Sequence, residues 1–319
     1  MSLSAFPGAD ALVGVGPGPT ATQRRAALRA ALAAGPLVLP GVTDALGVRL
    51  VERSGFAAAY VTGAGLANAQ FGVPDLGLIS QEEVAAHTRR LADASTVPLV
   101  VDADTGYGGP VTTMRTVRML EHAGAAGIQL EDQEMPKRCG HFDDHSLIPA
   151  EHMAAKIVAA RQALEDPTTV LVARTDARSV HDIDEAIRRA TLYVEAGADV
   201  IFVEAPRSVA ELRSVGEALH GTPLVVNVVE GGKTPELSLE EYEGLGFRVV
   251  LFANYLLRSM IWAGREALDH LARAGETATR ADRMAGWQER QQLFNLPAFT
   301  AAQAWYDDPT RVAPAGGAR

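Results

Sequence analysis

The chain has 319 residues, 47% of them hydrophobic and 21% charged, which is the balance of a soluble globular protein. A net charge of −10 without a basic patch argues against a nucleic-acid partner. No run of about 18 consecutive apolar residues occurs, which argues against a membrane span.

The first 21 residues are rich in Gly, Pro, Ala and Thr, and we expect them to form a flexible or weakly packed lead-in. Short apolar runs with many β-branched residues then recur along the chain, each followed by a stretch with helical spacing. They occupy residues 37–42, 58–63, 99–104, 127–132, 170–175, 200–205, 224–229 and 248–254. Continuously apolar strands indicate burial on both faces, as in a parallel sheet covered by helices.

Eight strand–helix units within about 230 residues match the size of a (β/α)8 TIM barrel. We therefore predict an α/β barrel over residues 22–272, in preference to an open doubly wound sheet, which usually has fewer strands. Residues 273–319 are expected to form a helical extension and a tail, with one additional helix over residues 279–294. Trp287, Leu293 and Phe294 in that helix are candidates for packing on a neighbouring subunit.

Polar side chains stand at the carboxyl ends of the expected strands, where catalysis occurs in this fold. They are Asp102, Asp104, Glu131, Asp132, Arg174, Asp176, Glu204 and Asn227, with Thr62-Gly63-Ala64 after the second strand. A helix cap or a rim ion pair is an equally good interpretation for any single one of them. Because buried charges are costly unless they are paired or bind a metal, the whole set indicates a cation, an anionic ligand, or both.

Asp102 and Asp104 are two residues apart, so their carboxylates are expected on the same side of the strand end. Together with Glu131, and without a cluster of His or Cys ligands, they suit Mg²⁺ or Mn²⁺ better than Zn²⁺. The glycines of "GAGLANA" at residues 63–69 lack the third glycine of a dinucleotide fingerprint, so we reject a dinucleotide site there.

The only cysteine of the chain, Cys139, lies in the segment "EDQEMPKRCGH" at residues 131–141. A single cysteine excludes an internal disulfide and fits a reducing cytoplasm. The cations Lys137 and Arg138 favour the thiolate, and Gly140 would let this long loop close over a substrate. We interpret the thiol as a proton donor or a nucleophile, although a lone cysteine is more often a small buried apolar residue.

Several of these stretches together resemble the isocitrate lyase and phosphoenolpyruvate mutase superfamily. They are "VTGAG", "GVPDLGL", "DADTGYG", "QLEDQ", "PKRCGH", "ARTDA", "VEAP" and "NVVEGGKTP", in the order of the family. The resemblance implies a Mg²⁺-dependent barrel that acts on 2-hydroxy or 2-oxo acids. It also implies a homotetramer in which C-terminal helices are exchanged between subunits.

The family pattern also implies roles for individual residues. Asp102 and Asp104 would serve the metal, with Glu131 in its outer shell. The catalytic motif would comprise Cys139, Lys137 and His141, with Arg174 binding a carboxylate. The remaining substrate-site positions would be Thr62, Gly63, Ala64, Asp75, Gly140, Glu204, Asn227 and Arg258.

The cysteine motif is typical of the branches that cleave C–C bonds, namely the methylisocitrate and dimethylmalate lyases and the related oxaloacetate hydrolases. We therefore expect a lyase that acts on a small di- or tricarboxylate. Thr62 stands where methylisocitrate lyases usually have serine, and "EGGKTP" is closer to the dimethylmalate lyase and hydrolase branch. The strand "FANYLLRS" keeps a phosphonate-forming mutase open as the alternative, and an inactive ligand-binding barrel is the non-enzyme alternative.

Overall fold

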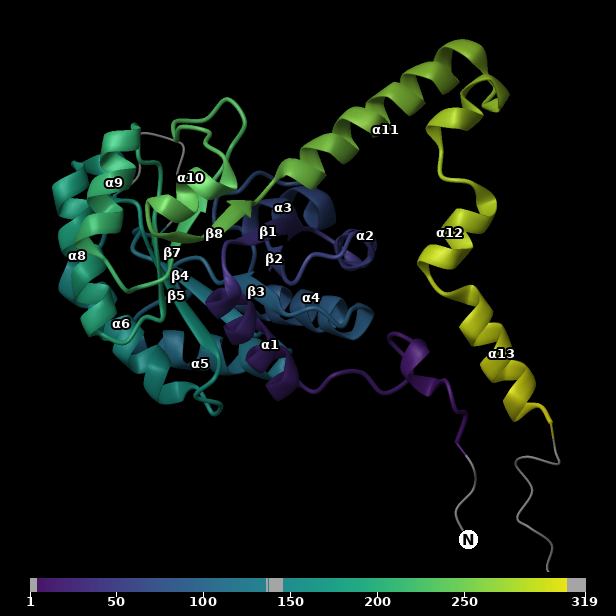
Figure 1. The fold of residues 1–319 in the computed structure, drawn as a ribbon, viewed down its shortest axis with the longest axis horizontal. Coiled ribbons are helices and arrows are strands. Elements are labelled where there is room, and N and C mark those ends of the chain that lie inside the picture. Colours follow the sequence, from purple (N-terminus) through teal and green to yellow (C-terminus); the bar gives the residue numbers. More distant parts are fainter. Residues whose placement is uncertain (1–4, 136, 138–145, 309–319) are drawn as a thin grey trace, which may run out of the picture.

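The computed structural model describes residues 5–135, 137 and 146–308, and its strands close into one parallel barrel (Figure 1). Each strand pairs with its neighbours in the chain, and the last pairs with the first. The predicted (β/α)8 barrel is confirmed. The strands are β1 Leu37–Val42, β2 Ala59–Val61, β3 Leu99–Asp102, β4 Gly127–Glu131, β5 Val170–Thr175, β6 Val200–Val203, β7 Leu224–Asn227 and β8 Phe247–Phe252.

Helices surround the barrel, and several begin at a side-chain cap. Thr20, Ser80 and Ser238 each form a capping box with the residue three positions on, which fixes where those helices start. The helices around the barrel are α1 Ala21–Ala34, α2 Ala45–Arg53, α3 Gly63–Leu66, the π-helix η2 Ala67–Phe71, α4 Gln81–Ala94, α5 Pro110–His122, α6 Ala150–Ala163, α7 Ala177–Val180, α8 Ile183–Glu195, α9 Val209–Ala218 and α10 Leu239–Gly244.

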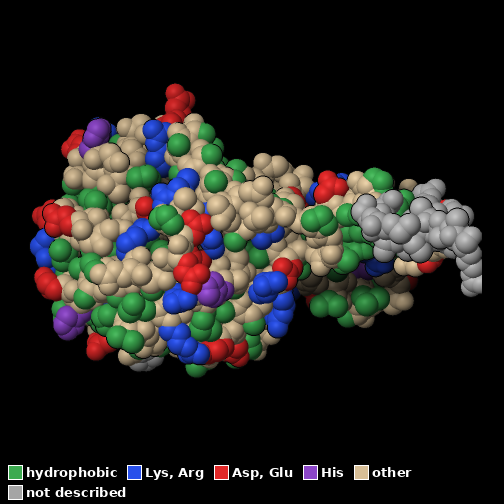
Figure 2. Space-filling view, turned by 90° about the horizontal axis from the view of Figure 1, so that it is seen from below, with side chains coloured by type: hydrophobic (Ala, Val, Ile, Leu, Met, Phe, Trp, Pro, Cys, Tyr) green, Lys and Arg blue, Asp and Glu red, His purple; other side chains and the backbone are tan. Residues whose placement is uncertain are grey.

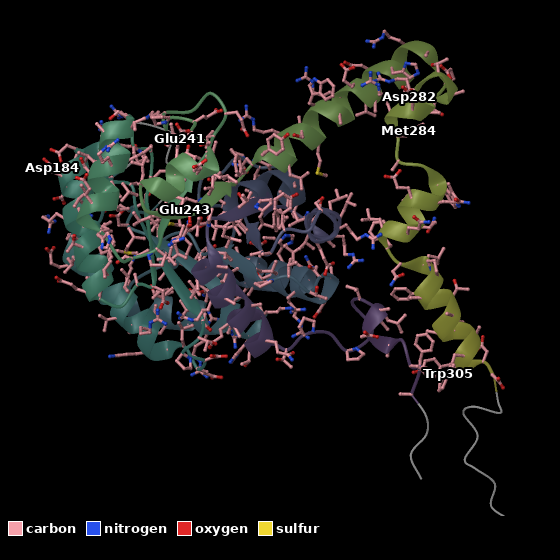
Figure 3. All side chains as sticks on the ribbon, viewed as in Figure 1. Asp184, Glu241, Glu243, Asp282, Met284 and Trp305 are labelled. Carbon is pink, nitrogen blue, oxygen red and sulfur yellow. The ribbon has the colours of Figure 1, made fainter. Side chains whose placement is uncertain are left out.

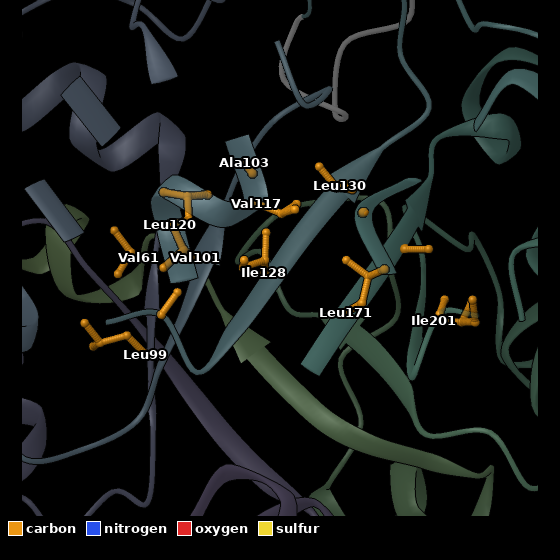
Figure 4. Close-up of a cluster of buried hydrophobic side chains, with 14 of the residues drawn as sticks. Val61, Leu99, Val101, Ala103, Val117, Leu120, Ile128, Leu130, Leu171 and Ile201 are labelled. Carbon is orange, nitrogen blue, oxygen red and sulfur yellow. The ribbon is translucent and has the colours of Figure 1, made fainter. Parts of the chain in front are cut away.

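The strands are buried on both faces, and alternate residues belong to two separate cores. In β3, Val100 packs inside the barrel, whereas Leu99 and Val101 pack in the layer between strands and helices. Figure 4 shows part of this outer layer, where Val117 and Leu120 of α5 lie against strand residues. Burial on both faces explains why the sequence shows continuous apolar runs.

The chain beyond β8 forms a separate projection, here called the C-terminal arm. Helix α11 (Tyr255–Ala274) leads away from the barrel, and the chain then returns through η3 (Ala278–Arg283), α12 (Trp287–Leu293) and α13 (Leu296–Tyr306) (Figure 1). Figure 3 places Asp282 and Met284 at the far turn of the arm and Trp305 near its end.

The single helix expected over residues 279–294 is wrong, because the chain breaks between η3 and α12, where Met284 and Gly286 both have an extended backbone. A second break follows this segment, where Asn295 adopts a left-handed φ of 54° directly before α13. Trp287 and Phe294 are exposed as expected. Leu293 is half-buried instead, and its carbonyl accepts a hydrogen bond from Arg49 of α2 at 3.1 Å.

The N-terminal lead-in contacts the end of the arm. The rings of Phe6 and Trp305 meet edge to face with centroids 6.2 Å apart, and Asn295 Nδ2 donates to the carbonyl of Ala11 at 2.9 Å. A short 3₁₀ helix, η1 (Ala9–Ala11), lies at this contact. The described part of the lead-in is therefore associated with α13, a contact between chain ends that the sequence did not indicate.

The surface of the barrel carries both signs of charge side by side, without a basic stripe on the face seen in Figure 2. In the described part of the chain, no helix is long and apolar enough to cross a membrane. The arm differs from the barrel because α11 buries none of its residues and exposes Ile261, Trp262 and Leu268 by half or more.

Candidate active site

A cavity of about 240 Å³ opens at the carboxyl ends of the strands. It brings together most of the residues that the sequence predicted for the site: Thr62, Ala64, Asp75, Asp102, Glu131, Lys137, Arg174, Glu204, Asn227 and Arg258. Cys139, Gly140 and His141 lie outside the described residues. Hollows of about 620 and 590 Å³ lie elsewhere on the surface, and neither is lined by the cluster of acids at the strand ends.

Asp102 and Asp104 form an acidic cradle around Gly63. A methyl group built on Gly63 would lie 3.2 Å from Asp102 Oδ2 and 3.2 Å from Asp104 Oδ1, so the glycine faces both carboxylates. Asp102 ends β3, and its Oδ1 accepts the backbone N–H of Asp104 at 3.1 Å. Asp104 adopts a left-handed φ of 48°, which turns the chain back beside the cradle.

Lys137 lies between two carboxylates and is almost completely buried. Its Nζ is 2.5 Å from Asp75 Oδ1 and 2.7 Å from Asp104 Oδ1. Burial acts to lower the pKa of Lys137, but the surrounding carboxylates, Asp104 foremost, raise it well above its usual value. Burial raises the pKa of Asp104 to about 6 although the lysine opposes the shift. The lysine therefore holds a positive charge beside the acidic cradle.

Arg174 extends from β5 and is held in a fork. Its Nε and Nη2 donate to the two oxygens of Asp176 at 3.0 and 2.8 Å. The guanidinium also lies over the ring of Phe202, 5.2 Å from the ring centroid. Glu131 and Glu204 lie farther away, each with an oxygen 3.5 Å from a guanidinium nitrogen. The strand register explains this group, because Arg174 pairs with Glu131 on one side and Phe202 on the other.

Two amides and a threonine hydroxyl also line the cavity. Thr62 Oγ1 donates to Asn254 Oδ1 at 3.3 Å, and Asn227 Nδ2 donates to Glu204 Oε2 at 3.4 Å. At the rim, Arg258 pairs with Glu230 at 2.7 Å, and the arginine side chain is half exposed. In this part of the structure, Asn227 Oδ1 and Glu131 Oε1 are buried without a hydrogen-bond partner among the described residues. Such atoms are costly to bury unless a ligand or an ordered water satisfies them.

The residues of the cradle fit Mg²⁺. Asp102 and Asp104 offer hard oxygen donors, and the unpartnered Glu131 Oε1 is suited to hold a metal-bound water. Among the described residues, no group of three or more His, Cys, Asp or Glu side chains could hold a metal ion by itself. Mg²⁺ usually keeps several waters and shares its shell with the substrate, so a sparse protein shell is consistent with this metal.

Two tyrosines, Tyr60 and Tyr107, lie close enough to the acidic cradle for its carboxylates to act on their phenols. Burial raises the pKa of Tyr60 well above its usual value, and Asp102 adds to the shift. Burial likewise raises the pKa of Tyr107, with Asp104 as the next cause. Both phenols are therefore protonated at neutral pH in the geometry described.

Sequence reasoning missed an apolar wall and one amide of the cavity. The wall is lined by Phe202, Val228, Leu251 and Ala253, and Asn254 stands beside it. These apolar residues belong to or follow continuously apolar strands, where period two does not reveal which face is inward. Their positions near the carboxyl ends of strands were the available indication.

A closed parallel barrel whose mouth gathers carboxylates, a buried lysine and a buried arginine defines an enzyme that binds a small charged molecule. The sequence profile described as phosphoenolpyruvate phosphomutase matches residues 28–272, and the chain belongs to that family. The prediction of an enzyme of the isocitrate lyase/PEP mutase type is confirmed.

Curated relatives cover most of the chain. The petal death protein of Dianthus caryophyllus is 43% identical over 274 residues, which are 86% of this chain and 84% of that protein. The 2,3-dimethylmalate lyase of Eubacterium barkeri is 40% identical over 82% of this chain and 90% of its own length. The 2-methylisocitrate lyase of Aeropyrum pernix is 42% identical over 82% of each protein.

Solved structures show the same architecture. A crystal structure of 2,3-dimethylmalate lyase matches with a TM-score of 0.84 and 34% identity, and covers 95% of this chain and 100% of that one. Oxaloacetate acetylhydrolase with 3,3-difluorooxalacetate matches at a TM-score of 0.82 and 31% identity, over 93% and 98% of the two chains. Phosphonopyruvate hydrolase in complex with oxalate and Mg²⁺ matches at 0.80 and 29% identity, over 89% and 99%.

Proposed function

We propose that this protein is a Mg²⁺-dependent C–C bond lyase. Its substrate is a small substituted 2-hydroxy di- or tricarboxylate of the 2,3-dimethylmalate or 2-methylisocitrate type, and its products are a 2-oxo acid and a carboxylate. The observation that carries the proposal is the cavity itself, which combines an acidic cradle, a buried arginine and an apolar wall. Relatives named for both lyase reactions support it.

In this proposal Asp102 and Asp104 hold the metal, and Glu131 holds a water in its shell. When bound, Mg²⁺ supplies a Lewis acid that stabilises negative charge on the C2 oxygen of the substrate. Lys137 fixes the position of Asp104 through its ion pair and offsets part of the negative charge of the cradle. A substrate carboxylate also enters this group of charges, so the lysine lowers the repulsion that it meets.

Arg174 binds a carboxylate of the substrate. Two of its five N–H groups are engaged by Asp176, and others remain for a charge-assisted hydrogen bond. The apolar wall of Phe202, Val228 and Leu251 accommodates the alkyl substituent at C3. A cavity of about 240 Å³ suits a small acid rather than a nucleotide-sized ligand.

The chemical step breaks the C2–C3 bond. A base removes the proton of the C2 hydroxyl group, C2 becomes the carbonyl of the 2-oxo acid, and the bonding electron pair moves to C3. The resulting enolate takes a proton from the Cys139 thiol. The cysteine role rests on the sequence motif, in which Lys137 and Arg138 precede the thiol.

The C-terminal arm supports an oligomer. We propose that residues 22–272 form the catalytic barrel and that residues 273–319 exchange between the subunits of a homotetramer. The exposed apolar residues of α11, among them Trp262 and Leu268, need a covering partner. A protein with this chemistry and a single thiol fits the cytoplasm.

The test compares wild type and Cys139→Ser on four substrates: 2,3-dimethylmalate, 2-methylisocitrate, oxaloacetate and phosphonopyruvate. A serine hydroxyl is a much poorer acid than a thiol, so we expect cleavage of 2,3-dimethylmalate and 2-methylisocitrate to fall about 10²–10⁴-fold while binding persists. Turnover of phosphonopyruvate alone would favour a phosphonate-forming mutase, and turnover of oxaloacetate alone a hydrolase. If the serine variant cleaves these substrates at the wild-type rate, the proposed role of the thiol is refuted.

A further inference from the structure

The fork between Arg174 and Asp176 is the end of a longer buried network. Both carboxylate oxygens of Asp176 accept hydrogen bonds from Arg174: Oδ2 from Nε at 3.0 Å and Oδ1 from Nη2 at 2.8 Å. Its side chain is completely buried, whereas 11% of the arginine side chain is exposed toward the cavity. Because the fork occupies one edge of the planar guanidinium, it determines which N–H groups face the cavity.

A second carboxylate, Asp132, holds Asp176 in place from behind. Asp132 Oδ1 accepts the backbone N–H of Asp176 at 3.0 Å, and its Oδ2 accepts the hydroxyl of Thr175 at 2.7 Å. Asp132 follows β4, whereas Thr175 ends β5, so these bonds join the ends of two adjacent strands. The turn that carries Asp176 is thereby fixed to the neighbouring strand.

Helix α8 completes the network from outside the barrel. Tyr193 donates its hydroxyl to Asp132 Oδ2 at 2.8 Å, and Arg189 Nη1 lies 3.2 Å from the same oxygen. Tyr193 is fully buried and Arg189 nearly so. Asp132 therefore accepts hydrogen bonds from four donors, and it does not line the cavity.

We infer that Asp176 is a positioning residue that orients Arg174 for a substrate carboxylate, with Asp132 as its anchor. A buried network in which every member is paired holds its groups rigidly, and an arginine fork that is already oriented loses less freedom when it binds a carboxylate. Asp176 also offsets the charge of Arg174 in the unliganded cavity. The inference rests on the proposed function only in assigning a carboxylate ligand to Arg174.

The primary test is the binding of oxalate in the presence of Mg²⁺, measured by calorimetry on the full-length protein. In Asp176→Asn, an amide NH₂ group faces an arginine N–H that formerly met an acceptor, so the guanidinium reorients. We expect the Kd of oxalate to rise about 10–100-fold, as for other residues that orient a ligand-binding group. KM for the diacid should rise more than kcat falls.

A matched control is available in a second bidentate pair outside the cavity. Arg178 donates to Glu211 at 2.8 and 2.7 Å, and neither residue lines the cavity. Glu211→Gln should therefore leave the Kd of oxalate unchanged. An equal loss of oxalate binding in both variants would overturn the inference, because it would indicate general destabilisation.

A double-variant cycle separates positioning from a structural effect. If Asp176 acts through the arginine, Arg174→Met and the double variant Arg174→Met/Asp176→Asn should bind oxalate equally weakly. The double variant should also resist urea better than Arg174→Met, which leaves the charge of Asp176 buried without its partner. Comparing Arg174→Met with the double variant tests whether Asp176 acts through Arg174 even if Asp176→Asn alone fails to fold.

The outcomes also separate this inference from the proposed function. Unchanged oxalate binding in Asp176→Asn, or losses that add in the double variant, would overturn the positioning role even if the lyase reaction is observed. Conversely, absence of lyase turnover in wild type would refute the proposed function, while coupled loss of oxalate binding would still support the positioning role.

Discussion

Replacing Gly63 with alanine places a methyl group inside the acidic cradle. The new Cβ would lie 3.2 Å from Asp102 Oδ2, 3.2 Å from Asp104 Oδ1 and 3.4 Å from Asp102 Cγ, whereas ordinary contact begins at 3.4 Å. The two carboxylates must therefore move apart by a few tenths of an ångström. Metal–oxygen distances tolerate only about 0.2 Å, so the geometry for Mg²⁺ is disturbed.

The expected magnitude follows from this displacement. Disturbing the support of metal ligands typically costs about 10–100-fold in metal affinity, or about 1.4–2.8 kcal/mol. Gly63 does not have a positive φ, so the backbone accepts alanine without strain. Because alanine restricts the unfolded chain, it can return about 0.4–1 kcal/mol of stability, and the fold should persist.

The assay is Mg²⁺ titration by calorimetry, together with turnover as a function of Mg²⁺ concentration and urea unfolding. Gly244→Ala is the matched control, since Gly244 ends α10 and an added methyl group there meets no atom within 4 Å. We expect Gly63→Ala to need about 10–100-fold more Mg²⁺ at similar stability, and the control to behave as wild type. Wild-type Mg²⁺ affinity in Gly63→Ala would refute the cradle as the metal site.

Four further outcomes are expected. Lys137→Met leaves the buried Asp104 and the half-buried Asp75 without their cation, so urea unfolding at pH 7 should show a loss of about 3–5 kcal/mol, and an unchanged midpoint would contradict the ion pairs. Ala205 has a left-handed φ of 55°, so Ala205→Gly should raise the free energy of unfolding by about 0.5–1 kcal/mol, and a decrease would show that the backbone is unstrained. Hydrogen bonds from Arg188 and Arg189 lower the pKa of Glu185 to about 2. The ionised carboxylate therefore stabilises the fold fully at pH values above the unfolded pKa of about 4.3, and this stabilisation is lost as the pH falls toward 2. Glu185→Gln should cost about 1–2 kcal/mol at pH 7 and progressively less below pH 4, whereas a difference independent of pH would contradict this. Truncation after residue 275 should disrupt the oligomer, and light scattering that finds the full-length protein monomeric would refute helix exchange.

The sequence predicted the barrel because its strands are buried on both faces and therefore appear as continuous apolar runs. It also predicted the strand-end acids, since a charge that follows such a run must lie at the mouth. The second strand was predicted too long: Thr62 caps the short helix α3 by accepting the N–H of Gly65 at 3.2 Å, so β2 ends at Val61.

The contacts between segments could not be predicted in the same way. Asp75 and Lys137 lie in different loops, and only the closed barrel brings them to 2.5 Å. Phe202 is indistinguishable from its apolar neighbours in the sequence, because inward and outward residues of a doubly buried strand have the same character. The break in the arm at Asn295 depends on a left-handed backbone, which asparagine permits but does not require.

The most direct test of the central claim is to follow 2,3-dimethylmalate and 2-methylisocitrate with the wild-type protein by NMR, after EDTA treatment and again after Mg²⁺ is restored. We expect a 2-oxo acid and a second carboxylate to appear in equal amounts only when Mg²⁺ is present. Cleavage at full rate in EDTA would contradict the metal assignment. Failure to cleave either 2-hydroxy acid with Mg²⁺, while phosphonopyruvate or oxaloacetate is consumed, would contradict the lyase assignment.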